Sequence, residues 1–235
     1  MTVRVRRVTT TRSGGVSAPP YESFNLGDHV GDDPAAVAAN RNRLASAIGL
    51  PADRVVWMNQ VHGVHVEVVD APRHSPFDDT DALVTCEPRL ALAVITADCV
   101  PVLLSDARAG VIGAAHAGRV GAADGVVLRT VEGMLAAGAH APDISVLLGP
   151  AVSGSNYEVP EDMAADVEAH LPGSRTTTPG GKPALDLRAG IARQLVAAGI
   201  TAIVIDPRCT VEDPALFSHR RGAPTGRLAS VVWME

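Results

Sequence analysis

Four short apolar runs follow one another closely in the middle of the chain, with no segment between them long enough for a helix. They span residues 82–85, 90–96, 100–104 and 111–115. Parallel neighbours need a crossover of a dozen or more residues, whereas antiparallel neighbours need only a tight turn. This spacing argues against a regular doubly wound sheet and favours mixed or antiparallel sheets with helices on the outside.

Helices and further strands are expected on both sides of this central group. Apolar spacing, capping residues and terminal glycines predict helices over residues 34–48, 121–137, 161–170 and 186–198. The chain shows no internal repeat and no interdomain linker. Apolar patterning predicts the remaining strands over residues 3–8, 55–58, 64–69, 145–148, 202–205 and 228–234.

Charge and composition limit the partners that the chain can bind. The net charge is −6 and aromatic residues make up 3% of the chain, which disfavours binding to a phosphate backbone and stacking on bases. The longest apolar candidate, residues 90–104, is interrupted by Asp98 and Pro101 and is too short to span a bilayer. We therefore expect neither nucleic acid nor a membrane as a partner, while a small anion held by local arginines stays open.

The three cysteines do not form a disulfide framework. Cys86, Cys99 and Cys209 are odd in number and widely separated, and none belongs to a C-x-x-C motif. Residues 1–7 are basic but lack an apolar stretch, so no signal peptide is expected. A reducing cytoplasm is the simplest compartment for such a protein.

Three residues with metal-binding side chains stand at the ends of expected strands. They are His62, Cys99 and His116, each close to a tight or glycine-bearing turn. Two imidazoles and one thiolate suit a tetrahedral zinc that keeps its fourth position open for water. Because the three residues lie far apart in the sequence, two ordinary histidines and one buried thiol remain the alternative.

The same residues also suit nucleophilic catalysis. Cys99 would attack as a thiolate, with His62 or His116 as its base. Asp98 would then orient the base or the metal ligands, and Asp81 would do so from behind them. The simpler alternative for both aspartates is a hydrogen bond to backbone amides at a strand end.

Copper and anion binding are two further possibilities in this sequence. None of the eight histidines forms an H-x-H pair, so a full multicopper centre is not expected. Several arginines near glycines or the Phe217-Ser218-His219 segment are candidate anion sites, although surface solubility explains most of them equally well. These arginines are Arg12, Arg41, Arg220, Arg221 and Arg227.

Together these segments resemble the YfiH-like family, also called the polyphenol-oxidase or laccase-domain family. The matching motifs run in order along almost the whole chain, and their combination is specific although each alone is weak. They include Gly14-Gly15-Val16-Ser17, Phe24-Asn25-Leu26-Gly27, Asn40-Arg41, Gln60-Val61-His62-Gly63, Asp81-Ala82-Leu83-Val84-Thr85, Thr96-Ala97-Asp98-Cys99-Val100-Pro101, His116-Ala117-Gly118, Tyr157-Glu158-Val159, Phe217-Ser218-His219-Arg220-Arg221 and Thr225-Gly226-Arg227.

The resemblance implies a fold, a metal site and an activity. The fold would be a single α/β domain over residues 1–235, a four-layer α-β-β-α sandwich with mixed sheets. The metal would be zinc, with copper as the alternative, held by His62, Cys99 and His116. The activity would be phosphorolysis of adenosine, inosine, guanosine and methylthioadenosine, together with adenosine deamination. Asn25 and Arg41 match family positions that would line the pocket for nucleoside and phosphate.

Two segments depart from the family pattern beside the expected metal site. The family continues its His-Ala-Gly motif with Trp and Arg, whereas this chain has Arg119 and Val120. The family's Phe-Ser-Tyr-Arg-Arg has His219 in place of Tyr, and a histidine there would titrate near neutral pH. Arg119 and His219 are therefore candidate substrate-binding residues, and Asp98 and His219 are candidate proton donors to the leaving purine.

Three other functions fit the same residues. A cysteine hydrolase that edits peptidoglycan precursors would use Cys99 and His116, and a laccase-like polyphenol oxidase would use copper. A non-catalytic binding protein would hold a structural zinc. Because structural zinc sites are normally closed by four protein ligands, that last function predicts a fourth ligand such as Cys209 or His65.

Overall fold

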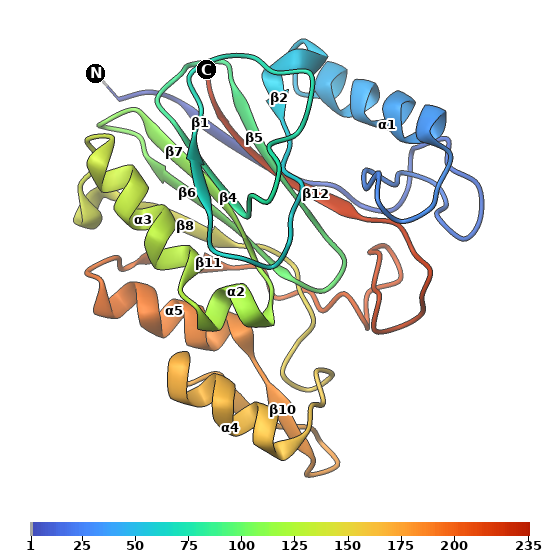
Figure 1. The fold of residues 1–235 in the computed structure, drawn as a ribbon, viewed down its shortest axis with the longest axis vertical. Coiled ribbons are helices and arrows are strands. Elements are labelled where there is room, and N and C mark those ends of the chain that lie inside the picture. Colours follow the sequence, from blue (N-terminus) through green and yellow to red (C-terminus); the bar gives the residue numbers. More distant parts are fainter. Residues whose placement is uncertain (1) are drawn as a thin grey trace.

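Two β-sheets lie face to face in the structure, a computed structural model that describes residues 2–235 (Figure 1). The smaller sheet has four strands, and it joins the two ends of the chain because β1 and β12 pair antiparallel within it. Its strand β2 is parallel to β5, so the sheet is mixed. The strand order is β1 (Val5–Thr9), β12 (Leu228–Met234), β5 (Ala91–Thr96) and β2 (Val55–Val56).

The larger sheet has six strands and is also mixed. Its two outermost pairs are parallel, and the three pairs between them are antiparallel. Of these three, the β6–β7 pair is the one joined directly by a tight turn. This arrangement confirms the predicted mixed sheets. The strand order is β11 (Ala202–Ile205), β8 (Ser145–Leu148), β6 (Val100–Asp106), β7 (Val111–Ala117), β4 (Ala82–Thr85) and β3 (Val66–Val68).

Side-chain alternation along the strands produces four layers. In β5, Leu92 and Val94 pack between the two sheets, whereas Ala93 packs against helix α1 (Pro34–Ala47). In β6, Leu103 faces the space between the sheets, and its neighbours on either side face the other helices. Both faces of these strands are buried, which explains why their sequences are almost continuously apolar.

The helices cover the outer faces of the two sheets (Figure 1). Helix α1 covers the four-stranded sheet, and α2, α3 and α5 cover the six-stranded sheet, with α4 packed beyond them beside a two-stranded hairpin. Two short 3-10 helices, η1 and η2, span Ala52–Arg54 and Ala141–Asp143. The remaining elements are α2 (Arg119–Ala123), α3 (Val126–Ala136), α4 (Glu161–His170), α5 (Leu187–Ala197), β9 (Arg175–Thr177) and β10 (Pro183–Leu185).

The structure differs from the sequence predictions at two places. The single helix predicted over residues 121–137 is two helices, α2 and α3, because Gly125 adopts a left-handed conformation with φ of 90° and breaks the helix. The β9–β10 hairpin was not predicted, since its three-residue strands are too short for an alternating pattern. Within residues 2–235, no helix has the length and apolar character needed to cross a membrane. The prediction about a signal peptide also concerns Met1, which lies outside the described residues.

Candidate metal centre

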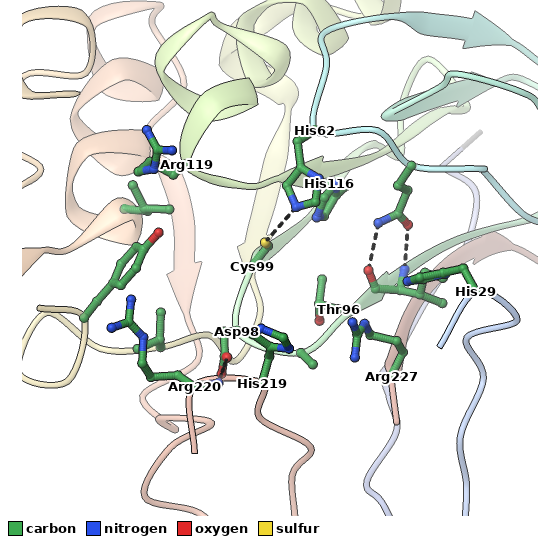
Figure 2. Close-up of a pocket in the computed structure, with 16 residues that line it drawn as sticks. His29, His62, Thr96, Asp98, Cys99, His116, Arg119, His219, Arg220 and Arg227 are labelled. Carbon is green, nitrogen blue, oxygen red and sulfur yellow. Dashed lines mark hydrogen bonds between the residues drawn. The ribbon is translucent and has the colours of Figure 1, made fainter. Parts of the chain in front are cut away.

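A cavity of about 360 Å³ opens at one end of the layer between the two sheets (Figure 2). His116 on β7 points into this layer, on the same side of its strand as Ile112 and Ala114. Thr96 on β5 does the same from the four-stranded sheet, on the side of Leu92 and Val94. The cavity is therefore floored by the apolar layer between the sheets and walled by strand ends and loops.

The structure brings together the three metal-binding residues that the sequence placed at strand ends. His62 comes from the loop between β2 and β3, Cys99 from the turn between β5 and β6, and His116 from the end of β7. The Cys99 Sγ and His62 Nε2 atoms are 3.8 Å apart. One ligand atom from each of the three lies within 4.8 Å of the other two, which is close enough for all three to bind one ion.

Asp81 holds two of these ligands from behind. It is completely buried, and its Oδ1 accepts hydrogen bonds from His116 Nδ1 at 2.8 Å and from the His62 backbone amide at 3.0 Å. Its Oδ2 accepts from the amides of Gly63 at 2.7 Å and Val61 at 3.2 Å. Because Nδ1 of His116 is bonded to a carboxylate, Nε2 is left to face the metal position.

The loop around His62 needs glycine where it approaches α2. His62 itself has a left-handed backbone, with φ of 62°. A Cβ on Gly118 would lie 2.5 Å from His62 Cδ2 and 3.3 Å from Cys99 Sγ, and a Cβ on Gly121 would lie 2.6 Å from the Gly63 carbonyl oxygen. The glycine of the His-Ala-Gly motif therefore leaves space for the ligand cluster.

The charges in the cluster favour a thiolate on Cys99 and a proton on His116 in the metal-free protein, and a bound metal ion would take the place of that proton. Burial raises the pKa of the Cys99 thiol, but the neighbouring His116 and His62 outweigh it and lower the pKa to about 6. For His116, burial lowers the pKa, but Cys99 and Asp81 raise it to about 9. Burial likewise raises the pKa of Asp81, whereas its bonds to His116 and the backbone amides bring it below its usual value. A thiolate with two imidazoles is a donor set that fits zinc.

Neither residue considered as a fourth ligand joins the cluster. Cys209 is buried, and its sulfur accepts a hydrogen bond from the Ser153 amide at 3.4 Å. His65 is exposed and pairs with Glu67 at 3.0 Å. Within residues 2–235, the metal-binding group is thus three side chains that face a cavity. This arrangement is typical of catalytic rather than structural zinc sites.

Three arginines line the same cavity. Arg119 and Arg220 lie on one side of the His62–Cys99–His116 cluster, and Arg227 lies on the other (Figure 2). The Arg220 guanidinium carbon lies 5.1 Å from the centre of the Tyr157 ring, which also lines the cavity. An acidic protein thus has a cationic pocket, which suits an anionic ligand.

Asp98 is the carboxylate among the described lining residues, and each of its oxygens accepts one hydrogen bond. Oδ1 accepts from the Thr210 hydroxyl at 2.5 Å, and Oδ2 accepts from the Arg220 amide at 2.7 Å. The residue has a backbone φ of 111°, an unusual value for a non-glycine residue. The hydrogen bond from the Arg220 amide thus joins the loop that carries Arg220 to the turn that carries Cys99.

Two residues that the resemblance assigns to the pocket contact other parts of the protein. Asn25 is fully buried, and its Oδ1 accepts a hydrogen bond at 2.8 Å from the backbone amide of Arg227. Arg41 lies over the Trp57 ring at 4.2 Å and pairs with Asp28 at 3.2 Å. Neither Asn25 nor Arg41 is among the residues that line the cavity.

The other two candidate substrate-binding residues, Arg119 and His219, do line the cavity. Thr96 and His29 also line it, and no role was predicted for either of them. Thr96 begins the Thr96-Ala97-Asp98-Cys99-Val100-Pro101 motif at the end of an apolar run, and His29 lies in a polar loop. The motif predicts a place near Cys99 but no function for the Thr96 hydroxyl.

Sequence comparison assigns the chain to a family. Residues 6–235 match the family described as multi-copper polyphenol oxidoreductase laccase. The chain belongs to this family. Two relatives named purine nucleoside phosphorylase match almost all of the chain. The relative from Mycobacterium tuberculosis (strain ATCC 25618 / H37Rv) is 72% identical, and the match covers the whole of this chain and 94% of that protein. The relative from Corynebacterium glutamicum is 59% identical, and the match covers 98% of this chain and 94% of that protein.

Solved structures of the same laccase-like family confirm the fold. The protein YfiH from Bacillus licheniformis, described as hypothetical, superposes with a TM-score of 0.91 and is 32% identical, covering 98% of this chain and 93% of that one. YlmD from Geobacillus stearothermophilus superposes with a TM-score of 0.88 and is 34% identical, covering 98% and 92% of the two chains. The predicted resemblance to the YfiH-like family is thus confirmed.

The lowered pKa of Cys99 predicts selective alkylation of the chelator-treated protein. At pH 7.5 the pH is above the Cys99 pKa of about 6, so Cys99 is a thiolate. Burial raises the pKa of the Cys86 thiol, which favours its protonated form. We expect iodoacetamide to label Cys99 faster than Cys86, although Cys86 is the more exposed. Peptide mass spectrometry across a pH series measures both rates. Faster labelling of Cys86 at pH 7.5 would contradict the assigned thiolate.

The position of Asp81 predicts weaker metal binding in Asp81→Asn. An amide cannot accept all the hydrogen bonds that hold His116 and the His62 loop, so zinc affinity should fall about 10- to 100-fold. Competition with a chromophoric chelator measures it. Asp206→Asn is the matched control, because Asp206 also accepts a hydrogen bond from a backbone amide, that of Arg208, and belongs to neither group of side chains that could hold a metal. Equal affinities in the two variants would show that Asp81 does not position the ligands.

Proposed function

We propose that this protein is a zinc-dependent purine nucleoside phosphorylase that also deaminates adenosine. Its substrates would be adenosine, inosine, guanosine and methylthioadenosine, with phosphate as the second substrate. The observation that carries the proposal is the His62–Cys99–His116 cluster inside a cavity that is also lined by arginines. The names of its relatives support the reaction class, and the three free cysteines suit a reducing cytoplasm.

The lining of the cavity suits a purine nucleoside. Tyr157, Val152 and Leu187 provide an aromatic ring and apolar side chains for a planar base. In phosphorolysis an oxygen of phosphate bonds to C1′ of the ribose while the C1′–N9 bond breaks, and the purine leaves with the electron pair and takes up a proton. The products are ribose 1-phosphate and the free base.

The charges around the cavity suit the ionic steps of this reaction. Arg119, Arg220 and Arg227 offset the charge of phosphate and of the departing purine. Asp98 acts as a positioning residue for the Arg220 loop, because both of its oxygens already accept hydrogen bonds. That leaves His219, which also lines the cavity, as the candidate proton donor to the purine.

Zinc fits the cluster better than a laccase-type copper centre. His62, Cys99 and His116 would hold the metal, and bound zinc supplies Lewis acidity that activates an oxygen nucleophile at neutral pH. Deamination would use that chemistry to replace the amino group at C6 of adenosine with oxygen from water, releasing ammonia. A multicopper centre of the laccase type binds several ions through H-x-H pairs, whereas the chain has no such pair, and the metal-binding group described at this cavity would hold a single ion. Polyphenol oxidation with copper is therefore not the function that we propose.

A cysteine hydrolase acting on peptidoglycan precursors is the second candidate. It rests on the lowered pKa of the Cys99 thiol beside His116. That reaction would need neither metal nor phosphate, which separates it from phosphorolysis.

The proposed function predicts two products from adenosine. With zinc-loaded protein, adenine should form only when phosphate is present, and inosine should form without phosphate. Both should be lost in Cys99→Ala, because this variant lacks one of the three metal-binding side chains. Chromatography of the reaction mixture measures both products.

Cys209→Ala is the matched control, because that thiol is buried outside the metal cluster. It should retain both products. If adenine forms without phosphate, the reaction is hydrolysis of the glycosidic bond rather than phosphorolysis. If zinc-loaded protein forms neither product, the nucleoside function fails for adenosine, and activity of chelated protein on peptidoglycan precursors would support the second candidate.

A further inference from the structure

The Thr96 side chain carries a polar atom that the fold leaves without a partner. Thr96 is only 2% exposed, and its Oγ1 makes no hydrogen bond within the protein. It also lines the cavity, at the end of β5. Buried hydroxyls are normally hydrogen-bonded, so an unpaired one in a cavity wall indicates a group that bonds to the ligand.

Arg227 lies beside Thr96 and is held rigidly. Leu228 pairs with Thr96 across β12 and β5, so Arg227 precedes the residue directly opposite Thr96. The Arg227 amide donates a hydrogen bond to Asn25 Oδ1. The Arg227 side chain packs against Gly27, where a Cβ atom would lie only 2.6 Å from Arg227 Cγ. Figure 2 shows Thr96 and Arg227 on the side of the metal cluster away from Arg119 and Arg220.

Part of the Arg227 guanidinium is available for a ligand. Its Nη1 donates to the carbonyl oxygens of Thr225 at 2.9 Å and Gly226 at 3.3 Å. Among residues 2–235, no acceptor pairs with its Nε or Nη2. A fixed guanidinium with free donors next to an unpaired hydroxyl is suited to a tetrahedral oxyanion.

The place of the lining carboxylate favours phosphate over the ribose beside Thr96 and Arg227. Recognition of ribose hydroxyls commonly uses a carboxylate. Asp98 is the carboxylate of the described lining, and its hydrogen bond from the Arg220 amide ties it to the Arg220 side of the cavity. A site that mainly offers donors suits an anion better than a sugar diol.

We propose that Thr96 and Arg227 form the phosphate subsite, with the Thr96 hydroxyl and the Arg227 guanidinium bonded to different oxygens of one phosphate. This inference rests on the proposed phosphorolysis. It places the nucleophilic phosphate on the side of the metal cluster opposite Arg119 and Arg220. The purine then lies toward Tyr157, which packs against Arg220.

The test is the phosphate dependence of Thr96→Val, which removes the hydroxyl and keeps the shape. The KM for phosphate should rise about 10-fold or more, the usual effect of losing a hydrogen bond to a charged group, while the KM for nucleoside stays within about twofold. Thr96→Ser should restore the phosphate KM. Arg227→Gln should raise it further, to about 100-fold. Calorimetric titration with inorganic phosphate should show weaker phosphate binding in both variants, Thr96→Val and Arg227→Gln.

Two control variants make the same chemical changes elsewhere. Thr130→Val removes a buried hydroxyl that bonds within α3, and Arg89→Gln removes an exposed positive charge just before β5, at its end far from Thr96. Both should leave the phosphate KM unchanged. Zinc content is measured in every variant so that damage to the metal site is recognised.

The outcomes separate this inference from the proposed function. A rise in nucleoside KM with an unchanged phosphate KM in Thr96→Val would assign Thr96 to the ribose and overturn the subsite. If the wild-type protein shows no phosphorolysis, the proposed function fails, and calorimetry still decides the subsite. Weaker phosphate binding in Thr96→Val and Arg227→Gln would support it, and unchanged or absent binding would overturn it.

Discussion

The hydrogen bonds of the buried Asp81 carboxylate organise the candidate metal centre. One oxygen bonds both to the His116 ring and to the His62 backbone, and the other bonds to the amides of Val61 and Gly63. A single side chain at the start of β4 therefore couples a loop to a neighbouring strand of the six-stranded sheet. Because the carboxylate is fully buried, these bonds act in a medium of low dielectric constant and are worth more than they would be in water.

The position of the cavity follows from the layered fold. Two sheets packed face to face leave an open end where their strands finish, and polar side chains at these ends face one another without disturbing the apolar layer. Arg119 from α2, and Arg220 and Arg227 from the segment between β11 and β12, then surround a thiolate and two imidazoles. The protein as a whole has a net charge of −6, so this local excess of positive charge distinguishes the cavity from the rest of the molecule and concentrates anions there.

Much of this arrangement is predictable from the sequence because it depends on short-range spacing. The strands between residues 82 and 117 are too close together for crossovers, which predicts mixed sheets. Gly125 breaks a helix whose apolar pattern continues across it, so the pattern alone gave one helix. Asn25 and Arg41 show a second limit: their motifs predict a place near the site, but the bond from Asn25 to the Arg227 amide and the packing of Arg41 on Trp57 are visible only in three dimensions. Thr96 ends an apolar strand, and only the three-dimensional structure shows that its hydroxyl lacks a hydrogen-bond partner.

In the proposed site, two imidazoles and one thiolate bind a single metal ion in front of the cavity. X-ray absorption at the zinc edge of the loaded protein measures this ligand set. We expect one sulfur at about 2.3 Å and two imidazole nitrogens at about 2.0–2.1 Å, with a light atom from solvent completing the shell. The sulfur contribution should disappear in Cys99→Ser. A shell without sulfur, or a sulfur contribution that persists in that variant, would contradict the claim.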